Sequence, residues 1–410
     1  MNQLNQHGAP MVAPEKIKQV EQATLATFRE ELPSIYFSDK SEAEFRAYSN
    51  NAEYAYRNLL KFPPKMFTGA NLIDFGAGTG ENTVSLAVWG ANCTLVEMND
   101  KALVIARQVF EHYAPNSPHQ FIQSSIFDYE SPSTYDIVHC RGVLSHTANK
   151  QGAFKKIAGF LKPGGYLIFG DPNKAGGFQN MLQRFAVYRH ATTWEEMERV
   201  CEKLFKEDID RSQSFINRTR RAIIFDRWVI QSQDDPSVEE VLGWLSANGL
   251  TLYSSYPPFV LPLLGDSIHH KPKFEATSVK GMAAISETIW MLQRSGDAEN
   301  VQALNADHLR YTNSLSLLTS YVANLNATSS LDMRHFNELA DETVAYFKDL
   351  SILKPLQTRL AEFIAEAKQF VCLVDSSNLD EIRAHIESCK HLFKGAIGVR
   401  HVDFIAYKDK

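Results

Sequence analysis

The sequence predicts an α/β protein built on an open, largely parallel β-sheet. The prediction rests first on the stretch Asn71–Gly80, where a short apolar run suited to a buried strand meets three alternating glycines. A helical pattern follows at once, with Val84, Leu86, Ala87 and Val88 as its apolar members. Strand, glycine turn and helix together are typical of the nucleotide-binding corner of such a sheet, because glycines let a ligand lie directly on the main chain.

Two acidic side chains indicate which kind of ligand this turn binds. A dinucleotide fingerprint has the spacing Gly-x-Gly-x-x-Gly, whereas this turn reads Gly-x-Gly-x-Gly, and Glu81 stands at the place of the third dinucleotide glycine. Asp74 lies two residues before the first glycine. Two carboxylates flanking the turn repel a pyrophosphate and suit a ligand that carries positive charge, such as an ammonium or a sulfonium.

Strand and helix patterns continue to alternate after the turn. Glu97 lies at the end of the next apolar run, where an acidic side chain can accept hydrogen bonds from both hydroxyls of a ribose. The turn Lys162–Gly165 is typical of a helix stop. The further strands of the sheet are expected at Cys93–Met98, Gln120–Ile126, Tyr135–Cys140, Tyr166–Gly170 and Leu250–Tyr256.

As a set, these motifs resemble the core of the class I S-adenosylmethionine-dependent methyltransferases, from the Asp-x-Gly-x-Gly-x-Gly motif at Asp74–Gly80 to the Leu-Lys-Pro-Gly-Gly turn at Leu161–Gly165. The resemblance covers residues 71–173 and implies a Rossmann-like seven-stranded sheet that binds S-adenosylmethionine and releases S-adenosylhomocysteine. The cofactor-binding residues that it implies are Asp74, Gly76, Ala77, Gly78, Gly80, Glu97, Met98, Ser125, Ile126 and Arg141.

One departure from the family concerns the adenine. Many members carry a Gly-Asp pair after the third strand, where this chain has Ser124 and Ser125. A serine hydroxyl can still accept a hydrogen bond from the adenine amino group, but it does so without charge. Backbone groups, with Ile126 or Phe127 against the ring, are the alternative way of holding the base.

Composition describes an ordinary soluble globular protein of 410 residues. The net charge of −6 argues against a nucleic-acid surface, so no DNA partner is expected. The five cysteines are scattered, which is typical of buried thiols in a reducing cytosol. No signal peptide or membrane-spanning run is seen, and the histidines lack metal-ligand spacing. We therefore expect a cytoplasmic protein without a bound metal.

Two N-terminal helices are expected before the core, at Ile17–Glu31 and Phe45–Lys61. Residues 1–70 are assigned to a region that covers the cofactor site. The second helix is rich in tyrosine, and two roles for these side chains remain open: closing over the methionine end of the cofactor, or packing their rings onto the sheet. The tyrosines are Tyr48, Tyr54 and Tyr56.

The segment 174–233 is too long for a simple connection within a sheet. It carries apolar residues at helical spacing and a capping box that begins at Thr193, so we expect a helical cap over the catalytic mouth that forms the substrate region. Residues 234–270 continue the core with a helix and the sixth strand.

The chain after the sixth strand shows a series of amphipathic helix patterns where the family has a short loop. Two accounts of residues 271–395 remain open: a helical insertion between strands six and seven, or a separate helical domain used for self-association into a homo-oligomer. Within residues 396–410, the stretch Val399–Tyr407 is expected to be the seventh strand, antiparallel between strands five and six. Asp403 is the polar exception to its apolar pattern.

Methyl transfer needs few reactive side chains, because the sulfonium is already a strong donor and the protein mainly aligns donor and acceptor. A general base is needed only for an acceptor that is protonated at neutral pH. His146, after strand four, and Asp171, at the end of strand five, are the candidate catalytic residues. For His146, packing near the cofactor without proton transfer is the alternative, and His139 is expected to be structural.

The predicted function is methyl transfer from S-adenosylmethionine to an oxygen or nitrogen of a small or medium-sized molecule. Alternatives are an RNA or protein methyltransferase, and a non-catalytic S-adenosylmethionine-binding interaction protein. A nicotinamide oxidoreductase is disfavoured by Asp74 and Glu81. A basic cluster, Arg218, Arg220 and Arg221, forms either an anion-binding site for the substrate or a solvated helix face.

Overall fold

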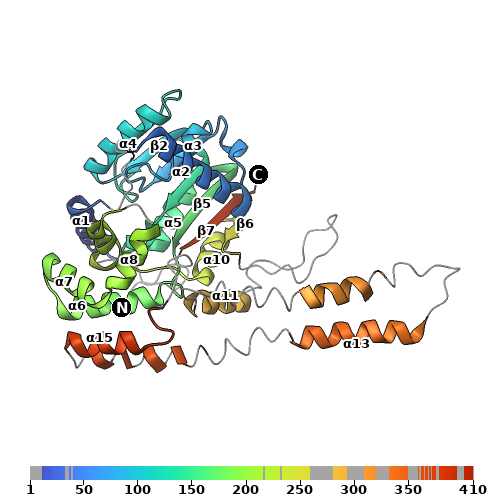
Figure 1. Cartoon of the computed structure of the whole chain (residues 1–410). Helices are drawn as coiled ribbons and strands as arrows, with labels where there is room; N and C mark the ends of the chain where they lie inside the picture. Colours follow the sequence, from blue (N-terminus) through green and yellow to red (C-terminus); the bar gives the residue numbers. More distant parts are fainter. Residues whose placement is uncertain are drawn as a thin grey trace, which may run out of the picture. The chain divides into compact units, whose positions relative to one another are not determined.

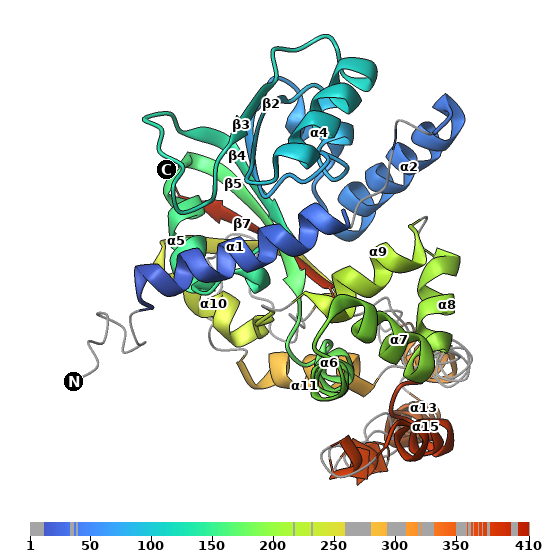
Figure 2. The same cartoon turned by 90° about the vertical axis from the view of Figure 1, so that its left-hand side faces the viewer.

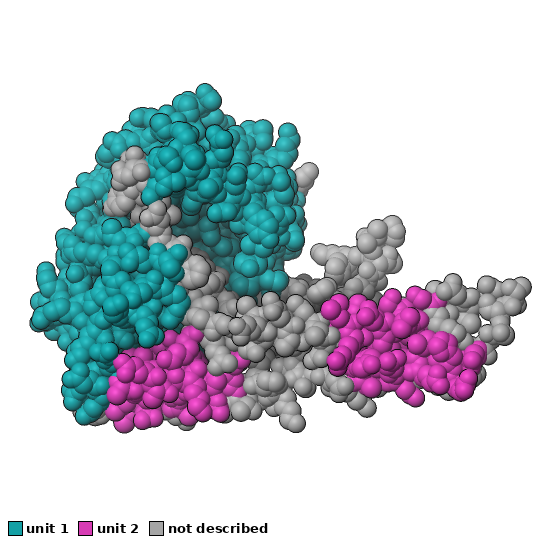
Figure 3. Space-filling view, viewed as in Figure 1, with its two compact units in different colours: residues 1–291, 374–383, 397–410 teal, residues 292–373, 384–396 magenta. Residues whose placement is uncertain are grey.

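The computed structural model divides the chain into two compact units (Figure 3). The first comprises Met1–Met291, Val374–Arg383 and Ile397–Lys410, and the second comprises Leu292–Leu373 and Ala384–Ala396. The residues that the structure describes are 12–32, 37, 40–215, 218–230, 233–258, 280–292, 309–318, 320, 332–349, 359, 362–363, 365–367, 369–370, 372–374, 378–394 and 401–409.

A seven-stranded sheet forms the centre of the first unit (Figure 1). Its strand order is β3-β2-β1-β4-β5-β7-β6, in which the first five strands are parallel and β7 runs antiparallel to both of its neighbours. This topology confirms the predicted fold class and the predicted place of the C-terminal strand. The strands are β1 (Asn71–Phe75), β2 (Asn92–Glu97), β3 (Gln120–Gln123), β4 (Tyr135–Arg141), β5 (Leu161–Pro172), β6 (Leu250–Tyr256) and β7 (His401–Lys408).

Strand β5 differs from its expected bounds because it begins five residues earlier, at Leu161 instead of Tyr166. Leu161 pairs with Tyr135, the register then shifts, and Tyr166 pairs with Ile137. The residues between them, which were expected to form only a helix stop, are absorbed by this irregularity in the ladder.

Both faces of the sheet are buried, because successive residues of a strand point to opposite faces. Leu72, Ile168 and Ile405 belong to one apolar cluster, and their chain neighbours Ile73, Phe169 and Phe404 belong to the other. This explains why the central strands β1, β2, β4 and β5 are mostly apolar on both faces, whereas the edge strands β3 and β6 carry more polar and partly exposed residues. The helices that flank the sheet are α3 (Val84–Val88), α4 (Asp100–Tyr113), α5 (Lys150–Gly159) and α10 (Val238–Ala247).

The N-terminal region forms helices close to the expected positions. They are α1 (Pro14–Glu30) and α2 (Glu42–Tyr54), followed by the short turns η2 (Ala55–Leu59) and η3 (Pro64–Phe67). Helix α2 begins with a capping box, in which the Ser41 hydroxyl accepts from the Glu44 amide and the Glu44 carboxylate accepts from the Ser41 amide.

The segment between β5 and α10 is helical over most of its described length, as expected, and we call it the cap. Figure 2 shows its helices gathered together, apart from those that flank the sheet. A capping box starts its second helix at Thr193, and buried aromatic rings, among them the stacked Phe205 and Trp228, give it an apolar core of its own. The elements of the cap are α6 (Phe178–His190), α7 (Trp194–Leu204), α8 (Lys206–Phe215), α9 (Arg220–Ile224) and η5 (Phe225–Val229).

The chain between β6 and β7 is helical wherever helices and strands are described. It contains α11 (Lys280–Leu292), helical residues 309–318, α13 (Met333–Asp349) and α15 (Leu379–Ser388). Part of the expected helix patterns in residues 271–395, and the first residues of the expected seventh strand, Val399 and Arg400, lie outside the described residues. Within the described part of the chain, no helix has the length and apolar character needed to span a membrane.

The place of β7 generates a stability prediction. Phe404 is 3% exposed and stacks on Phe169 of β5, with ring centroids 5.8 Å apart. Phe404→Ala should therefore lower the free energy of unfolding by about 3–5 kcal/mol, because it leaves a cavity between the sheet and its covering helices. Chemical denaturation measures the change.

Tyr253→Ala on neighbouring β6 is the matched control, since Tyr253 is 49% exposed. Equal losses of stability in the two variants would contradict a buried, central β7.

Candidate functional site

The glycine turn after β1 takes a backbone conformation that requires glycine. Gly76, Gly78 and Gly80 have φ values of +68°, +55° and +77°. A Cβ atom on Gly76 would lie 2.5 Å from Val143 Cγ2, and one on Gly80 would lie 2.8 Å from Phe110 Cε2. Backbone conformation therefore favours glycine at all three positions, close packing also requires it at Gly76 and Gly80, and residues 76–79 of the turn line one side of a cavity.

Glu97, at the end of β2, holds this turn through its carboxylate. Its Oε2 atom accepts a hydrogen bond from the Gly78 amide at 2.8 Å, and its Oε1 atom accepts one from the Asn99 amide at 2.7 Å. Glu97 is 8% exposed, and burial raises the pKa of its carboxyl while the backbone amides oppose that rise. The carboxylate thus joins the glycine turn to the start of α4 at the wall of the cavity.

Asp74 supports the same turn from beneath and does not line the cavity. Its Oδ1 atom accepts from His139 Nδ1 at 2.8 Å, and the Thr83 hydroxyl donates to Oδ2. The other nitrogen of His139 lies 3.2 Å from the Tyr56 hydroxyl. Asp74 as a cofactor contact stays a prediction; its side chain is 2% exposed and is hydrogen-bonded within the protein.

A cavity of about 430 Å³ lies at the carboxyl ends of the parallel strands, where ligands bind in sheets of this kind. Apolar side chains form most of its wall. The lining residues come from α1, the glycine turn, the ends of β2, β3, β4 and β5, and the cap, and include Thr24, Leu25, Phe28, Leu32, Thr79, Glu81, Asn82, Asn99, Phe127, Val143, Pro172, Ser212, Arg218, Ile223, Asp226, Arg227 and Gln233.

Most of the residues singled out from the sequence meet at this cavity. Those that line it are Gly76, Ala77, Gly78, Glu97, Met98, Ser125, Ile126, Arg141 and His146. Three do not: Asp74, Gly80 and Asp171. Gly80 packs against Phe110 and Ala106 of α4 instead, so the absence of a side chain at this position lets the turn lie close to α4.

Arg141 has a partner that no local sequence motif identified. Its Nε and Nη2 atoms donate to the two carboxylate oxygens of Asp403 at 2.7 and 2.9 Å, in a bidentate pair. Asp403 was the polar exception in β7, and this pair explains it. Gly170 makes room for the carboxylate, because a Cβ atom there would lie 2.0 Å from Asp403 Oδ1.

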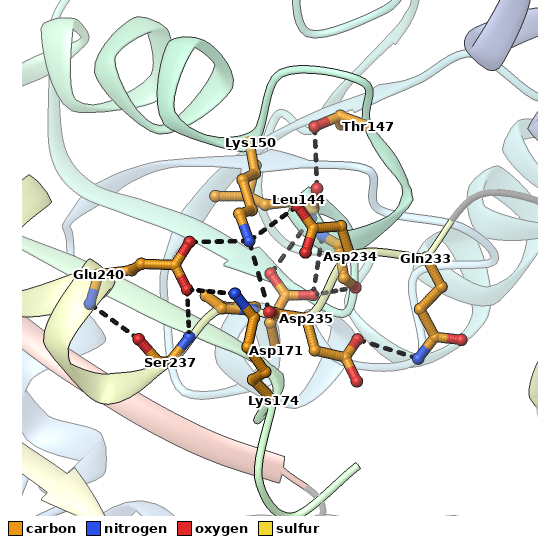
Figure 4. A network of polar contacts seen from close by, with 12 residues as sticks. Leu144, Thr147, Lys150, Asp171, Lys174, Gln233, Asp234, Asp235, Ser237 and Glu240 are labelled. Carbon is orange, nitrogen blue, oxygen red and sulfur yellow. Dashed lines mark hydrogen bonds and ion pairs between the residues drawn. The ribbon is translucent and has the colours of Figure 1, made fainter. Parts of the chain in front are cut away.

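Asp171 is a positioning residue for the loop that carries His146. It accepts from the Ser145 hydroxyl at 2.8 Å and from the amides of Leu144 and Ser145 at 3.2 and 3.4 Å. These bonds shape the turn η4 (Leu144–His146), as Figure 4 shows for Asp171 and Leu144. Asp171 as a catalytic base stays a prediction; its carboxyl is 2% exposed, is hydrogen-bonded to the loop after β4 and does not line the cavity.

The end of the cap is tied to the same loop by a polar network (Figure 4). The Asp234 amide donates to Ser145 O at 2.8 Å. Lys150 pairs with Asp234 and Glu240 at 2.9 and 3.0 Å, and Lys174 pairs with Glu240 at 2.9 Å. The chain that returns from the cap to α10 is thus fixed beside the His146 loop.

His146 faces the cavity from this loop, next to α1. The Thr24 hydroxyl donates to His146 O at 3.4 Å, and the Phe28 ring meets the imidazole edge-on with centroids 5.6 Å apart. Helix α1 therefore lines the cavity on this side. For the tyrosines of the following helix the sequence left two roles open: closing over the cofactor, or packing onto the sheet. Those tyrosines lie elsewhere: Tyr48 donates to Glu81 O at 2.9 Å, Tyr56 contacts His139, and Tyr54 is exposed.

The basic cluster of the cap separates into two groups. Arg220 pairs with Glu202 and Asp210, and Arg221 pairs with Glu198 and Glu30, all outside the cavity. Arg218 lines the cavity, with Nη2 3.1 Å from Glu81 Oε1 and Nη1 3.2 Å from Asp226 Oδ2. No cluster of three or more His, Cys, Asp or Glu side chains suited to a metal ion occurs among the described residues.

In a comparison with known protein families, residues 45–206 match a family model that is described as a methyltransferase domain. Over 108 residues the chain is 30% identical to the ubiquinone biosynthesis O-methyltransferase of Albidiferax ferrireducens, an alignment that covers 26% of this chain and 43% of that protein. It is 32% identical over 108 residues to the protein of the same name from Vibrio atlanticus, covering 26% and 45%. The chain thus spans less than half the length of these curated relatives.

Among solved structures, the chain is similar to the magnesium protoporphyrin IX methyltransferase of Synechocystis with bound S-adenosylmethionine. The identity is 18%, the alignment covers 40% of this chain and 79% of that chain, and the TM-score is 0.32.

Burial of Asp171 generates a pH prediction. Burial, with the nearby Asp235 adding to it, raises the pKa of the Asp171 carboxyl from 3.8 to about 7. Below about pH 3.8 the Asp171 carboxyl is protonated in both the folded and the unfolded protein, and its contribution to the free energy of unfolding is fully present. As the pH rises toward 7 the unfolded chain releases the proton first, so that contribution is lost. Asp171→Asn is neutral throughout, and its free energy of unfolding should fall less than that of the wild type between about pH 5 and pH 8.

Chemical denaturation at the two pH values measures this difference. Asp100→Asn is the control, because Asp100 lies on the surface and its pKa is lowered by Arg29. An Asp171→Asn variant with the same pH dependence as the wild type would show that Asp171 is already ionised throughout this range.

Proposed function

We propose that this chain, whose residues 45–206 form a class I methyltransferase domain, binds S-adenosylmethionine at the glycine turn and transfers its methyl group to a small or medium-sized molecule. The observation that carries the proposal is the carboxylate of Glu97, which is held by the Gly78 and Asn99 amides and faces the cavity. Glu97, at the end of β2, and the main chain of the glycine turn thus lie in the same wall of the cavity.

The residues around this carboxylate fit the parts of the cofactor. Glu97 retains lone pairs for the two ribose hydroxyls, since a carboxylate offers about four acceptor positions and two are used. Met98, Ser125 and Ile126 line the same cavity and supply apolar contact and one hydroxyl for the adenine. The methionyl part of the cofactor lies against the main chain of Gly76, Ala77 and Gly78, which line the cavity.

The charge of the site also favours a cationic donor. Four carboxylates and three guanidinium groups of the described residues line the cavity: those of Glu21, Glu81, Glu97 and Asp226, and those of Arg141, Arg218 and Arg227. Arg141 is neutralised by Asp403. This balance attracts a sulfonium and repels a pyrophosphate, which is the argument against a dinucleotide.

The acceptor proposed here is an apolar molecule that carries a hydroxyl group. Leu25, Phe28 and Ile223 give the cavity an apolar wall, and His146 is the cavity-lining side chain suited to take up the hydroxyl proton. S-Adenosylmethionine, when bound, supplies an electrophilic methyl group. The protein's part is to exclude water and to hold the hydroxyl between that group and His146. The names of the two curated relatives, both O-methyltransferases, support transfer to oxygen over nitrogen.

We also propose that the protein works in the cytoplasm. All five cysteines are free thiols, and four of them are buried. Free thiols are typical of a reducing compartment.

The first test concerns the cofactor. Isothermal titration should show binding of S-adenosylhomocysteine, and Glu97→Ala should weaken it by about 1–3 kcal/mol, because charge-assisted hydrogen bonds are lost and the turn loosens. Glu111→Ala, an exposed carboxylate on α4, should bind like the wild type. Binding of NAD together with no binding of S-adenosylhomocysteine would exclude the proposed function.

The second test concerns the base. A panel of phenols, catechols and anilines, assayed with methyl-labelled S-adenosylmethionine, identifies acceptors by the transferred label. For a phenolic acceptor, His146→Gln should lower kcat by about 10²–10⁴-fold and leave the affinity for S-adenosylhomocysteine unchanged. His112→Gln, on the exposed face of α4, is the control. Full activity of the His146 variant would show that the imidazole takes up no proton.

A further inference from the structure

A network of buried polar side chains lies beneath the glycine turn, outside the cavity. Its members are Tyr56 of η2, Asp74 of β1, Thr83 just before α3 and His139 of β4. Each of them is at most 4% exposed, and none of the four lines the cavity. Buried polar groups cost free energy unless they find hydrogen-bond partners, so a satisfied network of this kind fixes one arrangement of the segments that it joins.

One bond of this network closes the glycine turn at its base. Asp74 precedes the turn and Thr83 follows it, and the Thr83 hydroxyl donates to Asp74 Oδ2. The amides of Thr83 and Val84 donate to Gly80 O at 3.0 and 2.9 Å, which ties Thr83 to the last glycine. The bond between the Asp74 and Thr83 side chains therefore fixes the separation of the two ends of the turn.

The second oxygen of the Asp74 carboxylate is held from the neighbouring strand. Asp74 and His139 are paired across β1 and β4, with Asp74 Oδ1 2.8 Å from His139 Nδ1. His139 Nε2 lies 3.2 Å from the Tyr56 hydroxyl. Burial raises the pKa of the Tyr56 phenol, so this group keeps its proton and donates to Nε2. The proton of the neutral imidazole is then on Nδ1, which donates to Asp74.

We infer that His139 is a positioning residue for cofactor binding, because its Nδ1–H holds the Asp74 carboxylate in the orientation that closes the glycine turn. This inference rests on the proposed function and deepens it, since residues 76–79 of the turn line the cavity in which the cofactor is placed. His139 acts on the affinity for the ligand through Asp74 and the turn, without touching the ligand.

The composition of the turn explains why it needs this support. Three of its five residues are glycines with positive φ, and glycine loses more conformational freedom on ordering than any other residue. A turn that is already ordered by Asp74 and its partners spares the ligand that entropic cost on binding. Loss of the bond from His139 Nδ1 should therefore weaken the ligand even where the protein stays folded.

The test uses two amide side chains that each preserve one half of the imidazole. The amide of Asn lies near the place of Nδ1 and can still donate to Asp74, whereas the amide of Gln lies near the place of Nε2 and meets Tyr56 instead. In titration calorimetry with S-adenosylhomocysteine, His139→Asn should bind within about twofold of the wild type and His139→Gln about 10-fold more weakly. Both variants should lose stability in chemical denaturation, because His139 is fully buried, so only the affinity separates a positioning role from a structural one.

A second pair of variants tests the other side of the Asp74 carboxylate and serves where His139→Gln does not fold. Thr83→Val removes the hydroxyl at similar volume and should weaken S-adenosylhomocysteine about 10-fold, whereas Thr83→Ser keeps the hydroxyl and should bind within about twofold of the wild type. His119→Gln is the matched control, because His119 accepts from the Cys93 amide at 3.2 Å, near the end of β2 opposite Glu97. It should leave the affinity unchanged.

The outcomes separate this inference from the proposed function. If the wild type binds S-adenosylhomocysteine and the two His139 variants bind it with equal affinity, both unchanged or both weakened, His139 does not act through its Nδ1–H and the inference is wrong, while the methyltransferase assignment stands. Binding by Thr83→Val as tight as that of the wild type overturns the inference in the same way. If the wild type does not bind S-adenosylhomocysteine, the proposed function itself fails.

Discussion

The hydrogen bonds between the Glu97 carboxylate and the amides of Gly78 and Asn99 are the interaction on which the rest of the site depends. A buried carboxylate is costly unless its oxygens are satisfied, and here backbone donors from two different segments satisfy it. The same bonds fix the distance between the glycine turn and the end of β2. The cavity wall is therefore formed before any ligand arrives, which reduces the entropy that binding must overcome.

Other buried polar groups at the carboxyl ends of the strands hold loops in the same way. His139 and Thr83 bind Asp74 beneath the glycine turn, Asp171 binds the loop after β4, and Asp403 of β7 binds Arg141. Apart from the bond between Thr83 and Asp74, which are nine residues apart, these pairs join segments distant in the sequence at the edge of the sheet that forms the cavity. His146 differs from these buried polar residues, because hydrogen bonds hold the loop that carries it while its ring faces the cavity.

Local patterns predicted the parts of the fold that depend on local chemistry. The glycine spacing, the acidic end of β2 and the apolar strands were sufficient for the sheet, and β7 was placed because it was the remaining strand pattern. The sequence could not show that Asp74 and Asp171 lie outside the cavity lining, since the direction of a strand-end side chain depends on the pleat and on partners such as His139 and Ser145. The sequence also left open whether the tyrosines around α2 close over the cofactor or pack onto the sheet, because their spacing does not show where the rings point. Arg218 was not distinguished from Arg220 and Arg221, because its partner Glu81 lies 137 residues away.

The central claim is that Glu97 and the glycine turn form a rigid adenosine-binding corner. A crystal structure of the complex with S-adenosylhomocysteine tests it most directly. We predict that both ribose hydroxyls lie within hydrogen-bond distance of the Glu97 carboxylate, with the bond from the Gly78 amide retained and the turn displaced by less than about 1 Å. A ribose bound elsewhere, or a glycine turn that has separated from Glu97 to admit the ligand, would contradict the account.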